Sequence, residues 1–137
     1  MVDRAFVVAV LAGIVLALPY LAFVRGHRRP AIPLAAGLFI AALIYLPLVA
    51  IRADASAGWL EATGLFAFGV LALAGARLTA WLLVAGWSMH VGWDLLLHPV
   101  GDGGYVPGWY PALCVGFDIL VAGYALALVL RPRESLQ

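Results

Sequence analysis

Residues 5–24 read AFVVAVLAGIVLALPYLAFV, an apolar run without a charged side chain. A helix rises 1.5 Å per residue, so about 20 residues cross the hydrocarbon core of a bilayer. Most cations of this region, Arg25, Arg28 and Arg29, follow the run, and no convincing small-residue cleavage site accompanies it. The run therefore predicts a retained membrane-spanning helix and not a signal peptide.

The whole chain shares this apolar character. Of its 137 residues, 66% are hydrophobic and 11% are charged, and the mean hydropathy is +1.06. Soluble domains are about 45–50% apolar and about 25% charged. We therefore expect one integral membrane domain over residues 1–137. A net charge of +1 offers no basic surface for nucleic acid, and the lone Cys114 cannot form an intrachain disulfide.

Four more segments are long and apolar enough, or nearly so, to cross a membrane. With the first, the expected spans run roughly over 5–24, 31–51, 59–76, 78–98 and 110–130. This pattern predicts an all-α, polytopic transmembrane helical bundle of about five spans. The third segment is short and carries Glu61 near its start, so a four-span bundle with a half-buried third segment stays open.

Small residues predict where the spans touch. Residues with little or no side chain recur every four positions along the first span, at Ala5, Ala9, Gly13 and Ala17, and again in the fifth, at Ala112 and Gly116. Such strips let two helix backbones approach closely within a membrane.

Arginine placement indicates the orientation of the spans. With five spans, only Arg4 and Arg52 lie on one side of the membrane. The other side receives Arg25, Arg28, Arg29, Arg77, Arg131 and Arg133. Positive residues close to spans favour the cytoplasm. We therefore expect a multi-pass protein of the bacterial inner membrane, with its N-terminus outside and its C-terminus in the cytoplasm.

Ionisable side chains form a stripe within the fourth span, in GWSMHVGWDLLLHP at residues 86–99. His90, Asp94 and His98 are four positions apart and share one gently spiralling helix face. Inserting an ionisable side chain at bilayer depth costs about 2.5–3.5 kcal/mol of free energy. Such side chains therefore persist mainly where they face protein or water. Eight residues rise about 12 Å, which is too far for both histidines to bind one ion comfortably. Two overlapping half-sites or a proton relay are the expected arrangements.

The fifth span supplies facing side chains at matching depths. Counted from the outer helix ends, Asp118 lies level with His90, and Cys114 lies level with Asp94. Consecutive antiparallel helices joined by a short loop are usually neighbours. We therefore expect the fourth and fifth helices to share a polar centre.

Further candidates come from the same side of the membrane. Glu61 and Asp102 could add carboxylates, although both are expected chiefly as solvated acids. The candidate additional members of the site are Glu61, Cys114 and Tyr110.

Imidazole together with carboxylate suits zinc, iron or manganese, whereas calcium and magnesium favour oxygen ligands alone. The candidate metal ligands are His90, Asp94, His98 and Asp118. The same pairs could act as general acid and base, which makes His90, Asp94 and Asp118 the candidate catalytic residues. The alternative is a structural hydrogen-bond network that fastens the fourth helix to the fifth.

The C-terminal third carries a pattern that resembles a family of small bacterial and fungal multi-spanning proteins, the DUF6010 type. The pattern W-x-x-H-x-x-W-D-x-x-x-H, a Pro-containing loop and C-x-x-x-D-x-x-x-A is matched by Trp87, His90, Trp93, Asp94, His98, Pro107, Cys114, Asp118 and Ala122. Leu97 departs from it, because the family has two adjacent histidines there. The resemblance implies a membrane fold with a polar centre and no established activity.

Three classes of function are open. The first is a membrane enzyme with an outward-facing His/Asp or metal site, acting on a lipid or isoprenoid-like small molecule. The second is a proton or metal-cation transporter or channel subunit, for which a homo-oligomer could supply the missing inner half of the path. The third is a structural or accessory membrane subunit. No P-loop, Rossmann fingerprint, GxSxG, HExxH or CxxC motif occurs.

Overall fold

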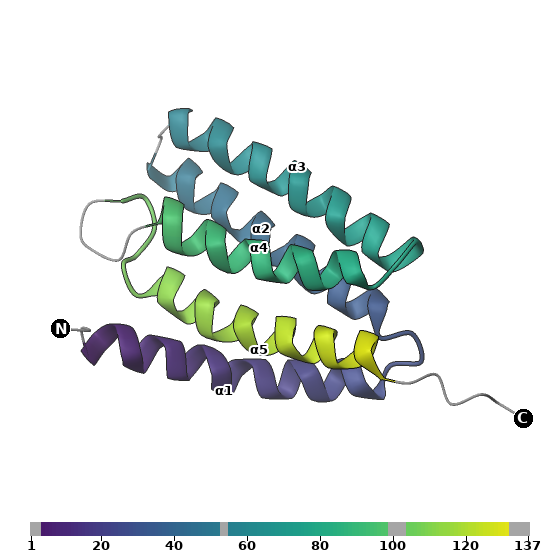
Figure 1. Cartoon of the computed structure of the whole chain (residues 1–137). Helices are drawn as coiled ribbons and strands as arrows, with labels where there is room; N and C mark the ends of the chain where they lie inside the picture. The colour runs from purple at the N-terminus through teal and green to yellow at the C-terminus, as the bar shows by residue number, and fades with distance from the viewer. Residues whose placement is uncertain (1–3, 53–54, 99–103, 132–137) are drawn as a thin grey trace, which may run out of the picture.

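The computed structural model describes residues 4–52, 55–98 and 104–131, which form helices and no strand (Figure 1). The helices are α1 (Arg4–Gly26), α2 (Ala31–Arg52), α3 (Ala55–Arg77), α4 (Trp81–Leu97) and α5 (Tyr110–Leu130). The all-α polytopic bundle predicted from the sequence is confirmed.

The third and fourth helices differ in length from the expectation. Helix α3 extends over 23 residues, so the third segment is not short, and it is apolar enough to cross a membrane. Four helices, α1, α2, α3 and α5, are long and apolar enough to cross a membrane. Helix α4 has 17 residues, close to the shortest length that spans a bilayer. The short helix is therefore the one that carries the polar stripe.

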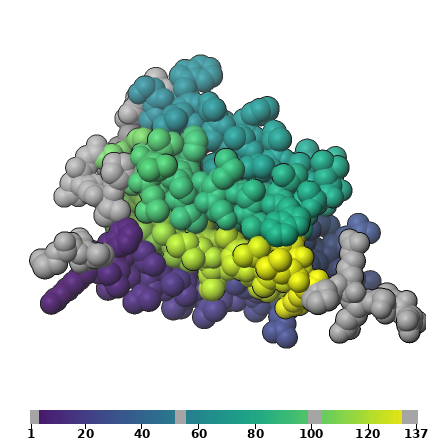
Figure 2. All heavy atoms as spheres, in the orientation of Figure 1, coloured from purple at the N-terminus to yellow at the C-terminus, as the bar shows by residue number. Residues whose placement is uncertain are grey.

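Successive helices run in opposite directions (Figure 1). The α1–α2 and α3–α4 connections lie at one end of the bundle, together with the C-terminal end of α5. Helix α1 packs chiefly on α5 and α2 chiefly on α3, while α4 lies between α3 and α5 and also contacts α2. Figure 2 shows α4 and α5 side by side on one face of the molecule. Side chains of α4 can therefore meet side chains from three other helices.

Trp87 of α4 fills the centre of the apolar core. Its side chain is fully buried among residues that include Val24, Leu38 and Val121, from three other helices. The indole N–H donates a 3.1 Å hydrogen bond to the carbonyl oxygen of Leu34. Trp87 thus packs the core and satisfies its polar atom within it, as buried indoles usually do.

Two glycines set the close approach of α1 to α5. A Cβ atom at Gly13 would overlap the carbonyl oxygen of Leu113, and one at Gly116 would overlap that of Val10. The predicted small-residue strips on these two helices therefore do face each other. Their contact brings α1 alongside α5.

Candidate functional site

Three buried side chains from α4 and α5 converge inside the bundle, and we call them the inner cluster: His90, Asp94 and Asp118. Nδ1 of His90 lies 2.7 Å from Oδ2 of Asp118 and 3.5 Å from Oδ2 of Asp94. No side chain of the three is more than 2% exposed. One ligand atom from each residue lies within 4.8 Å of the others, a spacing that could hold a metal ion.

The local sequence explains this convergence. His90 and Asp94 are one helical turn apart on α4, so both point toward the same neighbour. Asp118 lies eight residues beyond the start of α5 at Tyr110, and His90 lies eight residues before His98. Because α4 and α5 are antiparallel neighbours, equal distances from their shared end bring the two side chains together. The matched depths in the sequence predict this contact correctly.

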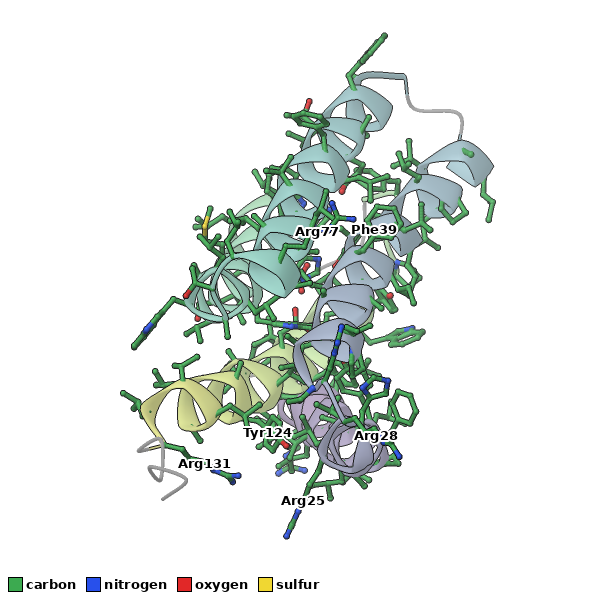
Figure 3. All side chains as sticks on the ribbon, turned by 90° about the vertical axis from the view of Figure 1, so that its right-hand side faces the viewer. Arg25, Arg28, Phe39, Arg77, Tyr124 and Arg131 are labelled. Carbon is green, nitrogen blue, oxygen red and sulfur yellow. The ribbon has the colours of Figure 1, made fainter. Side chains whose placement is uncertain are left out.

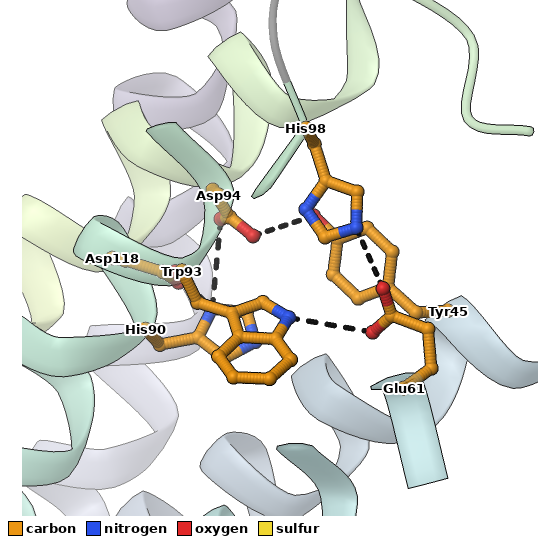
Figure 4. A network of polar contacts seen from close by, with 7 residues as sticks. All are labelled: Tyr45, Glu61, His90, Trp93, Asp94, His98 and Asp118. Carbon is orange, nitrogen blue, oxygen red and sulfur yellow. Dashed lines mark hydrogen bonds and ion pairs between the residues drawn. The ribbon is translucent and has the colours of Figure 1, made fainter. Parts of the chain in front are cut away.

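Tyr45 of α2 orients one of these carboxylates (Figure 4). Its hydroxyl donates a 2.6 Å hydrogen bond to Oδ1 of Asp94, and the tyrosine is 1% exposed. The other carboxylate oxygen, Oδ2, is fully buried and has no hydrogen-bond partner. Sequence reasoning missed Tyr45. Its position within an apolar span could have indicated a role in the site, because a buried Tyr hydroxyl usually has a hydrogen-bond partner.

Four side chains form a second group closer to the end of the bundle, which we call the outer cluster: Glu61, Trp93, His98 and Tyr105. Nε2 of His98 lies 2.7 Å from Oε1 of Glu61 and 2.9 Å from the Tyr105 hydroxyl. The Tyr105 hydroxyl donates to Oε1 of Glu61, and the indole N–H of Trp93 donates to Oε2 at 3.3 Å. Glu61 thus accepts hydrogen bonds through both oxygens.

The expectation that Glu61 is chiefly solvated is wrong, because this residue is 1% exposed. Helix α3 lies against α4, and Gly64 leaves room on it for the Trp93 ring. A Cβ atom at Gly64 would come within 2.6 Å of Cζ2 of Trp93. The close packing turns Glu61 toward His98 and away from solvent.

The predicted stripe on α4 therefore divides between two clusters. His90 and Asp94 belong to the inner cluster, whereas His98 pairs with Glu61 in the outer one. Tyr45 joins the two, because its ring also stacks on His98 with centroids 4.3 Å apart. The prediction that both histidines cannot share one ion agrees with this division. Asp102 falls outside the described residues.

Cys114 and Tyr110 line a groove beside the inner cluster. The groove has a volume of about 340 Å³ and runs between α1 and α2, with α5 as its floor. Apolar residues such as Leu16, Ile40 and Phe117 form most of its walls, and Asp118 also lines it. Asp118 is thus the one member of the inner cluster that borders the groove.

The inner cluster contains more potential negative charge than positive charge. Two ionised carboxylates carry a formal charge of −2, and one imidazole supplies at most +1. The described arginines lie in the end turns of helices or in the connections between them, away from this cluster. Uncompensated charge is costly at bilayer depth. A divalent cation beside a neutral imidazole would balance both carboxylates.

Comparison of the chain with protein-family models, with curated proteins and with solved structures found no match. The resemblance to the DUF6010 type stays a prediction.

Proposed function

We propose that the protein is a membrane metalloenzyme whose inner cluster binds one divalent transition-metal ion and acts on a lipid-soluble molecule. The observation that carries this proposal is the convergence of three buried ligand atoms within 4.8 Å, from His90, Asp94 and Asp118. Oδ2 of Asp94 supports it, because this buried oxygen faces His90 at 3.5 Å without a hydrogen bond, whereas buried polar atoms are normally hydrogen-bonded.

The donor set favours zinc, iron or manganese over calcium or magnesium, because one donor is an imidazole nitrogen. Three protein ligands leave a coordination position free, as in catalytic zinc sites. A metal ion held this way would supply Lewis acidity or an activated water. The hydrogen bond from Tyr45 to Asp94 would orient the ligand, as outer-shell partners commonly do.

The groove between α1 and α2 supports a lipid or isoprenoid-like substrate. Its walls are apolar, and it borders the inner cluster through Asp118. A hydrocarbon chain from the bilayer could lie in the groove with its polar end near the metal. Asp118 would then contact both the metal and the substrate, while His90 and Asp94 complete the metal site.

Turnover in vesicles tests this function. Purified protein loaded with zinc, iron or manganese is placed in vesicles made from extracted bacterial membrane lipid, and lipid products are measured by mass spectrometry. A product that forms with wild-type protein and is absent with Asp94→Asn supports the enzyme. Arg4→Gln, at the other end of α1 from the groove lining, is the matched control. Equal product from wild-type and Asp94→Asn protein would contradict the proposal.

Transport of protons or metal cations is a second candidate, because the two clusters form an almost continuous polar chain. Contacts run from Glu61 to His98, from the stacked Tyr45 to Asp94, and on through His90 to Asp118. Against it, the described parts of the helices carry no acid or histidine between Asp118 and the arginine-rich end. Ion flux into sealed liposomes distinguishes the two, since an enzyme alone conducts nothing.

The distribution of arginines supports a cytoplasmic location for the end that holds the α1–α2 and α3–α4 connections. In that orientation the inner and outer clusters lie in the outer half of a bacterial inner membrane.

A further inference from the structure

A second cavity lies at the end of the bundle remote from the outer cluster. Its volume is about 690 Å³, and it lies between the start of α2, the α3–α4 turn and the end of α5. Arg29, Thr79, Trp81 and Arg131 contribute polar or aromatic side chains to its lining. Its apolar lining includes Leu34, Leu83 and Leu128. The cavity is therefore amphipathic.

Positive charge gathers at this end of the bundle, toward which Figure 3 looks. The described arginines there are Arg25, Arg28, Arg29, Arg77 and Arg131. The described acids are Glu61, Asp94 and Asp118, and each contacts a histidine in one of the two clusters. Among the residues that the structure describes, no carboxylate is left to neutralise these arginines. The excess of arginine over acid in the described part of this end favours an anionic ligand.

The backbone that carries Arg29 is held in place. The Arg29 N–H donates a 3.1 Å hydrogen bond to Nδ1 of His27, and the Arg29 carbonyl accepts one from the Ile32 N–H at 3.0 Å. One turn into α2, the Pro33 carbonyl accepts a 2.8 Å hydrogen bond from Tyr20. Arg131 follows the last turn of α5 and lines the same cavity. Two arginine residues from different elements thus line one cavity.

The surroundings of the two arginines favour a lipid over a free anion. Trp81 is 52% exposed at this cavity, and exposed indoles favour the headgroup region of a membrane. Guanidinium groups bind phosphate oxygens in bidentate fashion. Basic pockets between membrane helices are known sites for acidic lipid headgroups. The apolar part of a lipid would contact Leu34, Leu83 and Leu128. Inorganic phosphate has no apolar part that could make these contacts.

We propose that this cavity binds the phosphate headgroup of an anionic phospholipid between Arg29 and Arg131. The site is separate from the inner cluster and does not depend on the proposed enzyme function. The bound lipid would anchor the start of α2 and the end of α5 to the membrane surface that carries the acidic lipid.

Lipid binding by the purified full chain in neutral detergent tests the proposal. Native mass spectrometry counts bound phosphatidylglycerol, with phosphatidylcholine as the uncharged comparison. We expect phosphatidylglycerol to bind preferentially and Arg29→Gln/Arg131→Gln to weaken that binding at least about tenfold, the contribution of one hydrogen bond to a charged group. The matched control is Arg25→Gln/Arg28→Gln, which removes the same charge at the same end from residues that do not line the cavity.

Each other outcome overturns the proposal. Equal binding of the two lipids would show that charge is not recognised, and equal losses in the two double variants would show diffuse surface attraction. Displacement of phosphatidylglycerol by millimolar inorganic phosphate would assign the cavity to a free anion. Circular dichroism and thermal unfolding establish that both double variants are folded, so that a loss reports on the site.

Discussion

The hydroxyl of Tyr45 donates a 2.6 Å hydrogen bond to Oδ1 of Asp94 and thereby joins α2 to the polar face of α4. Both side chains are buried. The bond leaves Oδ2 of Asp94 without a hydrogen-bond partner, on the side that faces His90. One oxygen of this carboxylate is thus held by Tyr45, and the other faces His90 at 3.5 Å without a hydrogen bond.

Tyr45→Phe should weaken metal binding while leaving the aromatic ring in place. Loss of an outer-shell hydrogen bond commonly lowers metal affinity about 10–100-fold. The Phe ring can still stack on His98, so the change isolates the hydroxyl. Calorimetric titration of the demetallated protein with Zn²⁺ measures the effect.

Tyr124→Phe is the matched control. This substitution removes the same hydroxyl from a different helix, and Tyr124 is not a member of either cluster. The variant should bind Zn²⁺ as the wild type does. Unchanged affinity in Tyr45→Phe would show that the hydroxyl does not orient a metal ligand.

The pairing of Glu61 with His98 should stabilise the contact between α3 and α4. His98→Ala leaves Glu61 buried without its imidazole and should cost about 3 kcal/mol, the low end for a broken buried pair. The low end is expected because Tyr105 and Trp93 still donate to Glu61. Thermal unfolding in detergent measures the loss.

A double-mutant cycle tests whether this loss belongs to the pair. Adding Glu61→Gln to His98→Ala removes the uncompensated charge and should recover part of the stability, with a coupling of about 0.5–3 kcal/mol. Strictly additive losses would mean that the two side chains do not stabilise each other.

Gly13→Ala should separate α1 from α5. The new Cβ atom would overlap the Leu113 carbonyl oxygen, which is backbone and cannot move aside cheaply. Overpacking of this kind costs about 1–3 kcal/mol. Gly123→Ala is the control, because a Cβ there meets nothing within 4 Å. A drop in thermal stability is expected in Gly13→Ala alone, and equal stability of the two variants would contradict the close approach.

Much of this arrangement could be predicted from the sequence, because the relevant signals are local. Apolar runs predict the helices, and the expected fifth span at 110–130 coincides with α5. The four-residue spacing on α4 and the equal depths on α5 predict the contact of His90 with Asp118. The strip of small residues around Gly13 predicts a packing face of α1.

The remaining site residues depend on how distant helices cross. Tyr45 and Glu61 reach α4 from α2 and α3, whose packing against α4 is set by side-chain shape at positions such as Gly64. No local pattern distinguishes Tyr45 from an interfacial tyrosine or Glu61 from a solvated acid. His98 is likewise assigned to the outer cluster only by the position of α3.

Ala41→Phe should block the groove between α1 and α2 without disturbing the metal. Ala41 lines the groove, so a phenyl ring at this position would fill the space in which the hydrocarbon chain of the substrate would lie. We expect lipid turnover in vesicles to fall at least tenfold, the effect of about 1.4 kcal/mol, with metal content unchanged. Ala50→Phe, on the exposed surface of the same helix, is the control. Full turnover in Ala41→Phe would place the substrate elsewhere.

Elemental mass spectrometry of the purified protein measures whether the inner cluster holds a metal ion. We expect one zinc, iron or manganese ion per chain in wild-type protein and in Glu61→Gln, whose change lies in the outer cluster, and loss of the ion in Asp118→Asn. Absence of stoichiometric metal from wild-type protein reloaded with these ions, or full retention in Asp118→Asn, would contradict this expectation. His90, Asp94 and Asp118 would then be a structural hydrogen-bond network that joins α4 to α5.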